Sequence, residues 1–212
     1  MSNCKIYLIS PPKINNSIIF RDLLDQILSF KIIECFQLRI KDELDEEILK
    51  LIKILHPICK KNNKPLIIND KPTIVKETKC EGVHIGPLDT PYKEARNIVG
   101  KNAIVGVTCK GSRHAAIEAA EKGADYVAFG SFYVSPTKND TELINTDILE
   151  IWNTTTTVPC VAIGGINLEN CMPLIKAGAD FLAISSGIWS FSEGPIRAIE
   201  LFEEKLLKNN FK

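Results

Sequence analysis

The 212-residue chain contains eight short hydrophobic runs, and a segment able to form a helix separates each from the next. Short apolar runs that alternate with helical patterns are typical of buried parallel strands in βαβ units. The predicted strands are residues 6–10, 36–40, 66–69, 83–86, 104–109, 126–131, 161–165 and 181–185. Eight such units predict an α/β fold, a (β/α)8 TIM barrel that forms one domain over residues 1–212.

The segment after the second predicted strand has apolar residues at helical spacing between positions 44 and 55. Asp42 precedes this stripe and is the predicted N-cap. Pro57 follows it. Because proline lacks a backbone N–H and crowds the preceding turn, we expect it to kink this helix or end it early.

An internal repeat supports the barrel. Residues 122–125 (Lys-Gly-Ala-Asp) lead into the sixth predicted strand, and residues 177–180 (Ala-Gly-Ala-Asp) lead into the eighth. In each copy the glycine, Gly123 or Gly178, is expected to adopt the left-handed conformation that ends the preceding helix. The repeat is therefore one of whole β/α units.

Composition narrows the class of partner. Acidic and basic residues balance at 26 each, so no overall field attracts nucleic acid or an anionic membrane. Seven cysteines without a Cys-x-x-Cys pair predict reduced core thiols in a cytoplasmic protein. No apolar run approaches a membrane span, and Pro11 and Pro12 interrupt the N-terminal run too early for a signal peptide. We expect small-molecule partners, and a homo-oligomer is compatible with the sequence.

The second predicted strand breaks the apolar pattern. Because side chains alternate along a strand, Gln37, Arg39 and Lys41 share one face, and Leu38 and Ile40 share the other. In a barrel the apolar face meets the helices, so the polar face points inward and toward the carboxyl end. That arrangement is costly without an anion to pair with the cations. The alternative is an edge strand of an open sheet with one face in water.

Two aspartates follow neighbouring predicted strands, Asp70 after the third and Asp89 after the fourth. Carboxylates at adjacent carboxyl ends can share one Mg²⁺, which takes a few oxygen ligands and keeps several waters. For Asp70 a helix N-cap is the competing interpretation, because a helical segment begins there. Among the histidines, His84 is predicted to be a hydrogen-bonded barrel residue, whereas His56 and His114 are predicted on helix surfaces.

Residues 123–138, with the sequence GADYVAFGSFYVSPTK, form an apolar run that ends in a polar loop. The loop carries Ser135, Thr137 and Lys138, whose hydroxyls and charge suit phosphate oxygens. A solvated loop is the alternative for so short a motif.

The seventh and eighth predicted strands end in Gly164-Gly165 and Ser185-Ser186-Gly187. Glycines allow close approach of backbone N–H groups to a ligand, and the loops after these two strands often hold a phosphate in TIM barrels. The sequence therefore predicts two anion sites: a monophosphate site near Gly165 and Ser185, and a more highly charged site, with a metal, near Arg39, Lys41 and Lys138.

Taken together, these motifs resemble the thiamine phosphate synthase (thiamine-phosphate pyrophosphorylase) family, and the likeness covers nearly the whole chain. The motifs that carry it are QLRIK at 37–41, IIND at 67–70, GVHIG at 82–86 with Asp89, GVT at 106–108, GADYVAFG-x₄-SPTK at 123–138, VAIGGI at 161–166 and AISSGI at 183–188. The resemblance implies a (β/α)8 barrel. It also implies the joining of hydroxymethylpyrimidine diphosphate to hydroxyethylthiazole phosphate, with release of pyrophosphate.

The resemblance also implies roles for individual residues. The pyrimidine diphosphate would be bound by Gln37, Arg39, Lys41, Asn69, Thr108, Ser135, Thr137 and Lys138. Asp70 and Asp89 would hold Mg²⁺, and Gly165, Ile184 and Ser185 would hold the thiazole phosphate. Arg39, Lys41 and Lys138 would serve catalysis by stabilising the departing pyrophosphate, without a protein nucleophile.

The chain departs from the family pattern in places. Pro87-Leu88 stand before Asp89 where the family usually has Gln-Glu, Lys71 stands where a second acidic residue is common, and Thr108 replaces a serine. Two other functions remain open. A related thiazole tautomerase would use a histidine where this chain has Lys110, and a non-catalytic phosphate-binding paralogue would tolerate the altered loop.

Overall fold

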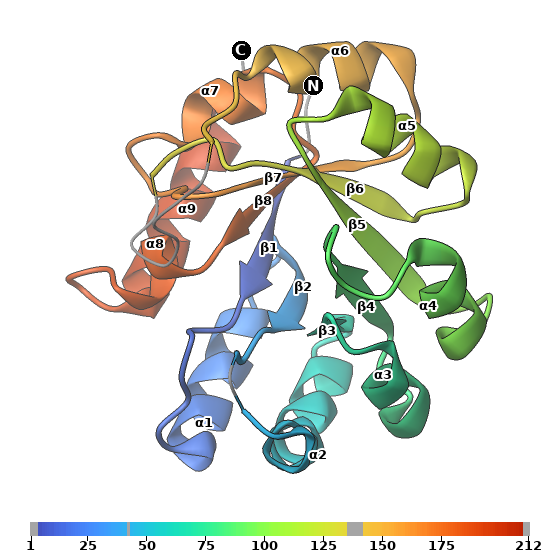
Figure 1. Cartoon of the computed structure of the whole chain (residues 1–212). Coiled ribbons are helices and arrows are strands. Elements are labelled where there is room, and N and C mark those ends of the chain that lie inside the picture. Colours follow the sequence, from blue (N-terminus) through green and yellow to red (C-terminus); the bar gives the residue numbers. More distant parts are fainter. Residues whose placement is uncertain (1–3, 42, 135–141, 210–212) are drawn as a thin grey trace.

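The computed structural model describes residues 4–41, 43–134 and 142–209, and it shows a closed barrel of eight parallel strands in sequential order (Figure 1). The strands are β1 (Lys5–Ile9), β2 (Ile33–Leu38), β3 (Leu66–Asn69), β4 (Gly82–Ile85), β5 (Ile104–Lys110), β6 (Tyr126–Phe129), β7 (Cys160–Ile163) and β8 (Phe181–Ile184). Pairing of β1 with β8 closes the sheet. The predicted TIM barrel is confirmed, and the alternative of an open sheet with β2 at its edge is wrong.

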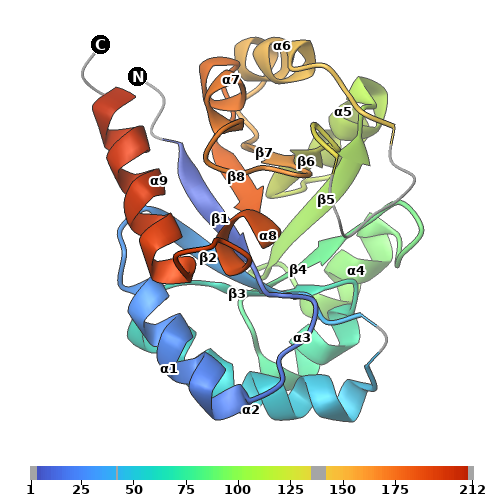
Figure 2. The same ribbon diagram turned by 90° about the vertical axis from the view of Figure 1, so that its left-hand side faces the viewer.

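Helices surround the strands, and α9 lies outside the barrel next to α1 and α8 (Figures 1 and 2). The described helices are α1 (Ser17–Leu28), α2 (Asp45–Lys61), α3 (Pro72–Thr78), α4 (Tyr92–Val99), α5 (Arg113–Glu121), α6 (Asp147–Thr155), α7 (Cys171–Lys176), α8 (Ser186–Trp189) and α9 (Pro195–Asn209). No described helix is long and apolar enough to cross a membrane.

Helix α2 differs from its prediction at both ends. Its N-cap is Leu44, while Asp42 lies outside the described residues. The helix continues past Pro57 to Lys61, so the proline does not end it. Acidic residues in its first turn and lysines in its last turn favour the helix by complementing its dipole.

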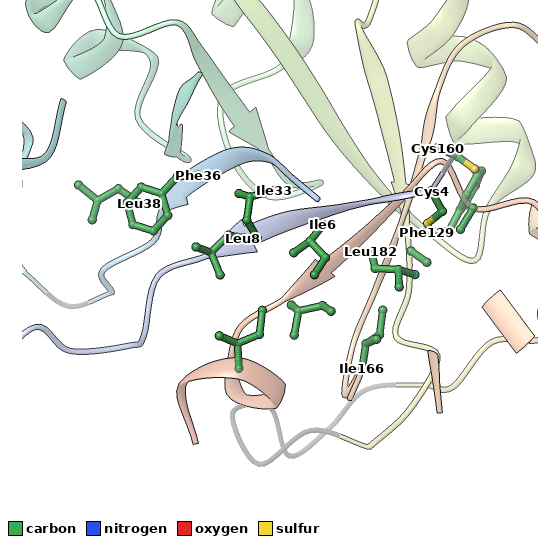
Figure 3. Packing of buried hydrophobic residues seen from close by; sticks show 14 of the residues in the cluster. Cys4, Ile6, Leu8, Ile33, Phe36, Leu38, Phe129, Cys160, Ile166 and Leu182 are labelled. Atoms are coloured by element: carbon green, nitrogen blue, oxygen red, sulfur yellow. The ribbon is translucent and has the colours of Figure 1, made fainter. Parts of the chain in front are cut away.

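Strand alternation divides the core into two layers. Ile6, Leu8 and Phe36 belong to the outer cluster between strands and helices (Figure 3). Tyr7 and Cys35, which neighbour them in sequence, belong to a separate cluster inside the barrel. The barrel interior is therefore lined by every second residue of each strand, as period-two alternation requires.

The repeated Gly-Ala-Asp segments end helices as predicted. Gly123 and Gly178 have φ values of 95° and 96°, a left-handed conformation that glycine adopts without steric cost. Each repeat's aspartate then ties two strands together at their amino ends. Asp125 accepts a hydrogen bond from the backbone N–H of Val105 (2.7 Å), and Asp180 accepts one from the N–H of Cys160 (2.8 Å).

A third carboxylate performs the same task before β4. Glu81 accepts a hydrogen bond from the N–H of Leu66 (2.9 Å). Its other carboxylate oxygen lies 2.9 Å from Nε2 of His56, within hydrogen-bond distance. His56 is buried, so the prediction that it lies on a helix surface is wrong. His114 does lie on the surface, with its side chain 86% exposed.

All seven cysteines of the sequence are free and buried, which confirms them as core thiols. Burial raises the pKa of Cys80 to about 11 and that of Cys59 to about 12. Thiols with such pKa values are poor nucleophiles near neutral pH.

Replacement of Asp180 by Ala is expected to lower the free energy of unfolding by about 1–3 kcal/mol, because the N–H of Cys160 loses its acceptor in a partly buried position. Asp180→Asn keeps an acceptor oxygen and should recover part of this loss. Urea unfolding measures both variants. Glu121→Ala, on the exposed end of α5, is the control and should change stability by less than about 0.5 kcal/mol. Equal stability of Asp180→Ala and the parent chain would contradict the strand-tying role.

Candidate active site

Two basic residues follow β2 at the barrel mouth. The strand ends at Leu38, so Arg39 and Lys41 lie in the loop after it rather than within the strand as predicted. The Arg39 N–H donates to the Ser10 hydroxyl (3.0 Å), and that hydroxyl donates to the Arg39 carbonyl oxygen (3.2 Å). Partial burial lowers the pKa of the Arg39 guanidinium, against the opposing effect of Asp70. The loop therefore holds Arg39 close to that aspartate.

Asp70 follows β3 and lies beside Asp89, close enough for the two carboxyl groups to interact directly. Burial, and then the Asp89 carboxyl group, raise the pKa of Asp70 to about 6, against the opposing charges of Arg39 and Lys41. The N-cap position of α3 is Lys71, and no side chain caps that helix. Asp70 is therefore not a helix cap, and its charge is directed to the site.

The turn before Asp89 is held by reciprocal hydrogen bonds. The Gly86 N–H donates to Oδ2 of Asp89 (2.7 Å), and the Asp89 N–H donates to the Gly86 carbonyl oxygen (3.2 Å). A Cβ at Gly86 would lie 2.9 Å from that Oδ2, so glycine makes room for the carboxylate. Leu88 is 97% exposed. Pro87 and Leu88 thus occupy the outside of a turn that still brings Asp89 to Asp70.

The carboxylate pair fits a divalent cation, because two half-buried like charges repel each other unless a cation lies between them. The Asn69 amide donates to Asp70, which fixes one of the oxygens. Lys71 forms an ion pair with Asp45, so its charge is engaged away from the pair. The described residues contain no group of three or more His, Cys, Asp or Glu side chains suited to a metal. Mg²⁺ needs only one or two carboxylates when phosphates and waters complete its shell.

A chain of hydrogen bonds crosses the barrel interior below these charges. Nε2 of Gln37 donates to the Tyr7 hydroxyl (3.0 Å), which lies 2.8 Å from the Tyr126 hydroxyl. The Tyr126 hydroxyl is 2.9 Å from Nδ1 of His84, and Nε2 of His84 is 2.7 Å from Oγ1 of Thr108. Two predicted site residues, Gln37 and Thr108, are therefore connected through Tyr7, Tyr126 and His84, none of which was predicted to belong to the site. His84 is a hydrogen-bonded barrel histidine, as expected.

A pocket opens beside β7 and β8. It has a volume of about 260 Å³ and is lined by Val134, Gly165, Ile166, Asn167, Ser186, Gly187, Ser190 and Phe191. Ile184 is buried in β8, and the Ser185 hydroxyl donates to the Ser10 carbonyl oxygen (2.9 Å). Among the described residues, the pocket lining thus includes Gly165 and the residues after Ser185, but neither Ile184 nor Ser185. The glycine-serine motifs marked this region, but not which serine faces the pocket.

The segment after β6 packs over Gly165. The Tyr133 N–H donates to the Gly164 carbonyl oxygen (3.1 Å), and a Cβ at Gly165 would lie 2.3 Å from the carbonyl oxygen of Val134. Glycine at this position therefore makes room for the loop backbone. Ser135, Thr137 and Lys138 lie outside the described residues.

Comparison with known proteins supports one family. The family described as thiamine monophosphate synthase matches residues 6–188. The thiamine-phosphate synthase of Rhodospirillum centenum is 45% identical over 202 residues, covering 95% of this chain and 97% of the relative. That of Erythrobacter litoralis is 42% identical over 206 residues, covering 95% of each. This chain belongs to the thiamine monophosphate synthase family.

Solved structures agree with this assignment. A thiamine phosphate pyrophosphorylase from Pyrococcus furiosus superposes with a TM-score of 0.83 at 25% identity, covering 98% of this chain and 97% of that one. A 3-hexulose-6-phosphate synthase superposes with a TM-score of 0.64 at 15% identity, covering 94% of this chain and 99% of that one. The second likeness concerns the barrel fold alone. The thiamine monophosphate synthase family resemblance seen in the motifs is confirmed.

Replacing Asp70 by Asn should stabilise the metal-free protein at high pH. Because the folded-state pKa of Asp70 is raised, the folded protein loses stability as pH rises from about 4 through 6. Asn removes this charge and tolerates the φ of 63° at this position. With discount for solvent screening, we expect about 0.5–1.5 kcal/mol of added unfolding free energy at pH 8 and no gain at pH 4.

Urea unfolding in chelator at the two pH values measures this effect. Asp22→Asn, on the exposed side of α1, is the matched control and should change stability by less than about 0.5 kcal/mol. A less stable Asp70→Asn protein at pH 8 would contradict the argument from charge repulsion.

Proposed function

We propose that this chain catalyses the joining of hydroxymethylpyrimidine diphosphate and hydroxyethylthiazole phosphate, which gives thiamine phosphate and pyrophosphate. The observation that carries the proposal is that two regions whose chemistry suits anions lie at one barrel mouth. Arg39, Lys41, Asp70 and Asp89 gather after β2, β3 and β4, and a pocket of about 260 Å³ lies after β7 and β8. One substrate carries a diphosphate and the other a monophosphate, so each region has a matching partner. The names of the relatives support the same reaction.

The pyrimidine diphosphate is assigned to the charged region. Gln37, Asn69 and Thr108 contribute polar groups from the strands below it, and Arg39 and Lys41 supply positive charge. Ser135, Thr137 and Lys138 keep the diphosphate-binding role that the family motif implies for them.

Asp70 and Asp89 would hold Mg²⁺. When bound there, the cation would neutralise diphosphate oxygens and so favour departure of pyrophosphate. The half-buried carboxylate pair and the raised pKa of Asp70 support this assignment.

The thiazole phosphate is assigned to the pocket lined by Gly165, Ser186 and Gly187. Backbone N–H groups of a loop after β7 and of the chain entering α8 can donate to a phosphate at this position, an arrangement common in TIM barrels. Ile184 and Ser185 position that segment from β8. The two substrates then meet over the interior of the barrel.

The reaction breaks the bond between the pyrimidine methylene carbon and the diphosphate oxygen, and the electron pair leaves with pyrophosphate. The lone pair of the thiazole nitrogen forms the new bond to the same carbon. The electron-rich aminopyrimidine stabilises positive charge that develops on the methylene carbon. Arg39, Lys41 and Lys138 stabilise the negative charge that develops on the leaving oxygen, so the protein acts by positioning and electrostatics.

Incubation of the protein with both substrates and Mg²⁺ is expected to yield thiamine phosphate and pyrophosphate in equal amounts. Excess chelator should abolish turnover, and added Mg²⁺ should restore it, because the diphosphate then regains its counter-ion. Chromatography of both products measures the result. Activity that persists in chelator would overturn the metal assignment, and absence of product with Mg²⁺ would overturn the proposed reaction.

Gly165→Ala should raise KM for the thiazole phosphate by about tenfold or more, with little change in KM for the pyrimidine diphosphate. The added Cβ would displace the Val134 backbone that lines the pocket. Gly100→Ala is a matched control, because Gly100 also has a positive φ of 84° but no atom lies within 4 Å of the added Cβ. Steady-state kinetics with each substrate varied in turn measures both. Equal effects of the two substitutions would show that backbone strain alone is responsible.

A further inference from the structure

The hydrogen-bond chain from Gln37 to Thr108 connects two residues of the proposed pyrimidine site through three side chains inside the barrel. Tyr7, Tyr126 and His84 are all buried, and they come from β1, β6 and β4. Buried polar groups that are mutually bonded in this way polarise one another and adopt one joint arrangement. Whether the residue at one end donates or accepts a hydrogen bond is therefore coupled to whether the residue at the other end does.

With the Gln37 amide oriented as a donor to Tyr7, counting hydrogens along the chain gives one direction. Gln37 donates an amide N–H to the Tyr7 oxygen, and in this direction the Tyr7 O–H is the donor to Tyr126 across the 2.8 Å contact between the two hydroxyls. The Tyr126 O–H then donates to Nδ1 of His84, and Nε2–H of His84 donates to Oγ1 of Thr108. Each of the four bonds uses one hydrogen. With Gln37 as donor, the reverse direction would leave the Tyr7 O–H without an acceptor among the described residues.

The rings are packed so that this geometry is kept. Tyr126 stacks on His84 with ring centroids 5.6 Å apart and an interplanar angle of 16°. Tyr7 meets Tyr126 edge to face at 5.7 Å. A Cβ at Gly106 would lie 1.9 Å from the Tyr126 ring. The glycine of the GVT motif therefore leaves room for that ring. Tyr126 has little freedom to turn its hydroxyl away.

We propose that Tyr7, Tyr126 and His84 are positioning residues that fix the hydrogen-bond polarity of the pyrimidine site. They hold His84 in the Nε2–H tautomer, so that the Thr108 hydroxyl accepts from His84 and donates its own hydrogen to the substrate. At the other end, the Gln37 amide oxygen is left to accept, since it receives no hydrogen bond within the described part of the chain. The assignment of the two ends to the pyrimidine diphosphate rests on the proposed function.

This polarity selects a substrate by its donors and acceptors. A ligand that spans the floor of the mouth can pair with both ends by presenting an N–H or O–H to the Gln37 amide oxygen and a lone pair to the Thr108 hydroxyl. An amine-bearing heterocycle with an attached diphosphate satisfies both ends. An analogue whose amine is replaced by a carbonyl loses the donor to the Gln37 amide oxygen and should bind more weakly, because a buried polar atom left unpaired is costly.

The tautomer of His84 tests this hydrogen-bond chain, called the relay below, without any substrate. Protein labelled with ¹⁵N-histidine is measured by two-bond proton–nitrogen correlation, and the His84 signals are assigned by their loss in His84→Gln. The expected result is a single neutral Nε2–H form, which changes to an exchanging mixture of tautomers in Tyr126→Phe. An Nδ1–H or doubly protonated His84 in the parent chain overturns the proposal. So does an unchanged tautomer in Tyr126→Phe.

Kinetics then test whether Tyr126 acts through Thr108. Tyr126→Phe and Thr108→Val should each lower kcat/KM for the pyrimidine diphosphate about tenfold, the scale of one hydrogen bond in a buried site. The double variant should lose no more than either single variant, because both interrupt the same path. Thr108→Ser keeps the hydroxyl and should retain activity. Tyr92→Phe, whose hydroxyl contacts Arg96 outside the barrel, is the matched control and should be unaffected.

Multiplied losses in the double variant would overturn the relay, since they would show two independent effects. Failure of the proposed reaction itself would appear as absence of product in the parent chain, whatever the state of His84. The tautomer measurement therefore separates failure of the relay from failure of the function.

Discussion

Pairing of β1 with β8 closes the sheet, and closure decides which side chains share the interior. In a closed parallel barrel every second residue of each strand points inward, and all carboxyl ends meet at one mouth. Tyr7, Gln37, His84 and Tyr126 are brought together in this way from four strands, although they lie far apart in the sequence. An open sheet would leave most of these groups in water, and water would then compete for the same donors and acceptors. The polar interior and the charged mouth both depend on the ring being complete.

The acidic pair of Asp70 and Asp89 lowers the stability of the folded protein without a cation, although it is the proposed metal site. Asp70 is held beside Asp89 with a raised pKa, which is unfavourable for the protein alone. Reciprocal bonds between Gly86 and Asp89 keep the second carboxylate in place. Such strain is tolerable because the outer core, with residues such as Phe36 and Leu38 almost fully excluded from solvent, provides ample stabilisation elsewhere. The repulsion between the two carboxylates would be relieved by the Mg²⁺ proposed for this site.

Much of this arrangement could be predicted from the sequence, because it follows from periodicity. The alternation around Gln37 and Leu38 gave their opposite faces, and the two Gly-Ala-Asp segments gave the helix ends. The remainder depends on three-dimensional proximity that periodicity does not encode. Tyr126 in an apolar run has the pattern of an ordinary core residue, and only the ring of strands shows what its hydroxyl touches.

Other local differences have the same origin. His56 lies on α2, but Glu81, just before β4, contacts its side chain, and the histidine is buried. Ser185 and Ser186 are indistinguishable by type, and their roles differ because the Ser10 carbonyl accepts from only the first of them. Pro57 remains within α2 because tertiary packing of that helix outweighs its local cost.

The carboxylates that tie strand starts together have a consequence for how the barrel can change over evolution. Glu81, Asp125 and Asp180 each clasp the strand before their own, and all three lie at the amino-terminal rim. These three side chains thus join neighbouring units at the rim opposite the candidate site. A turn such as Gly86–Asp89 can then accept a proline and an exposed leucine without loosening the sheet. The loop before Asp89 can therefore differ from the family pattern while the strands stay joined at their amino ends.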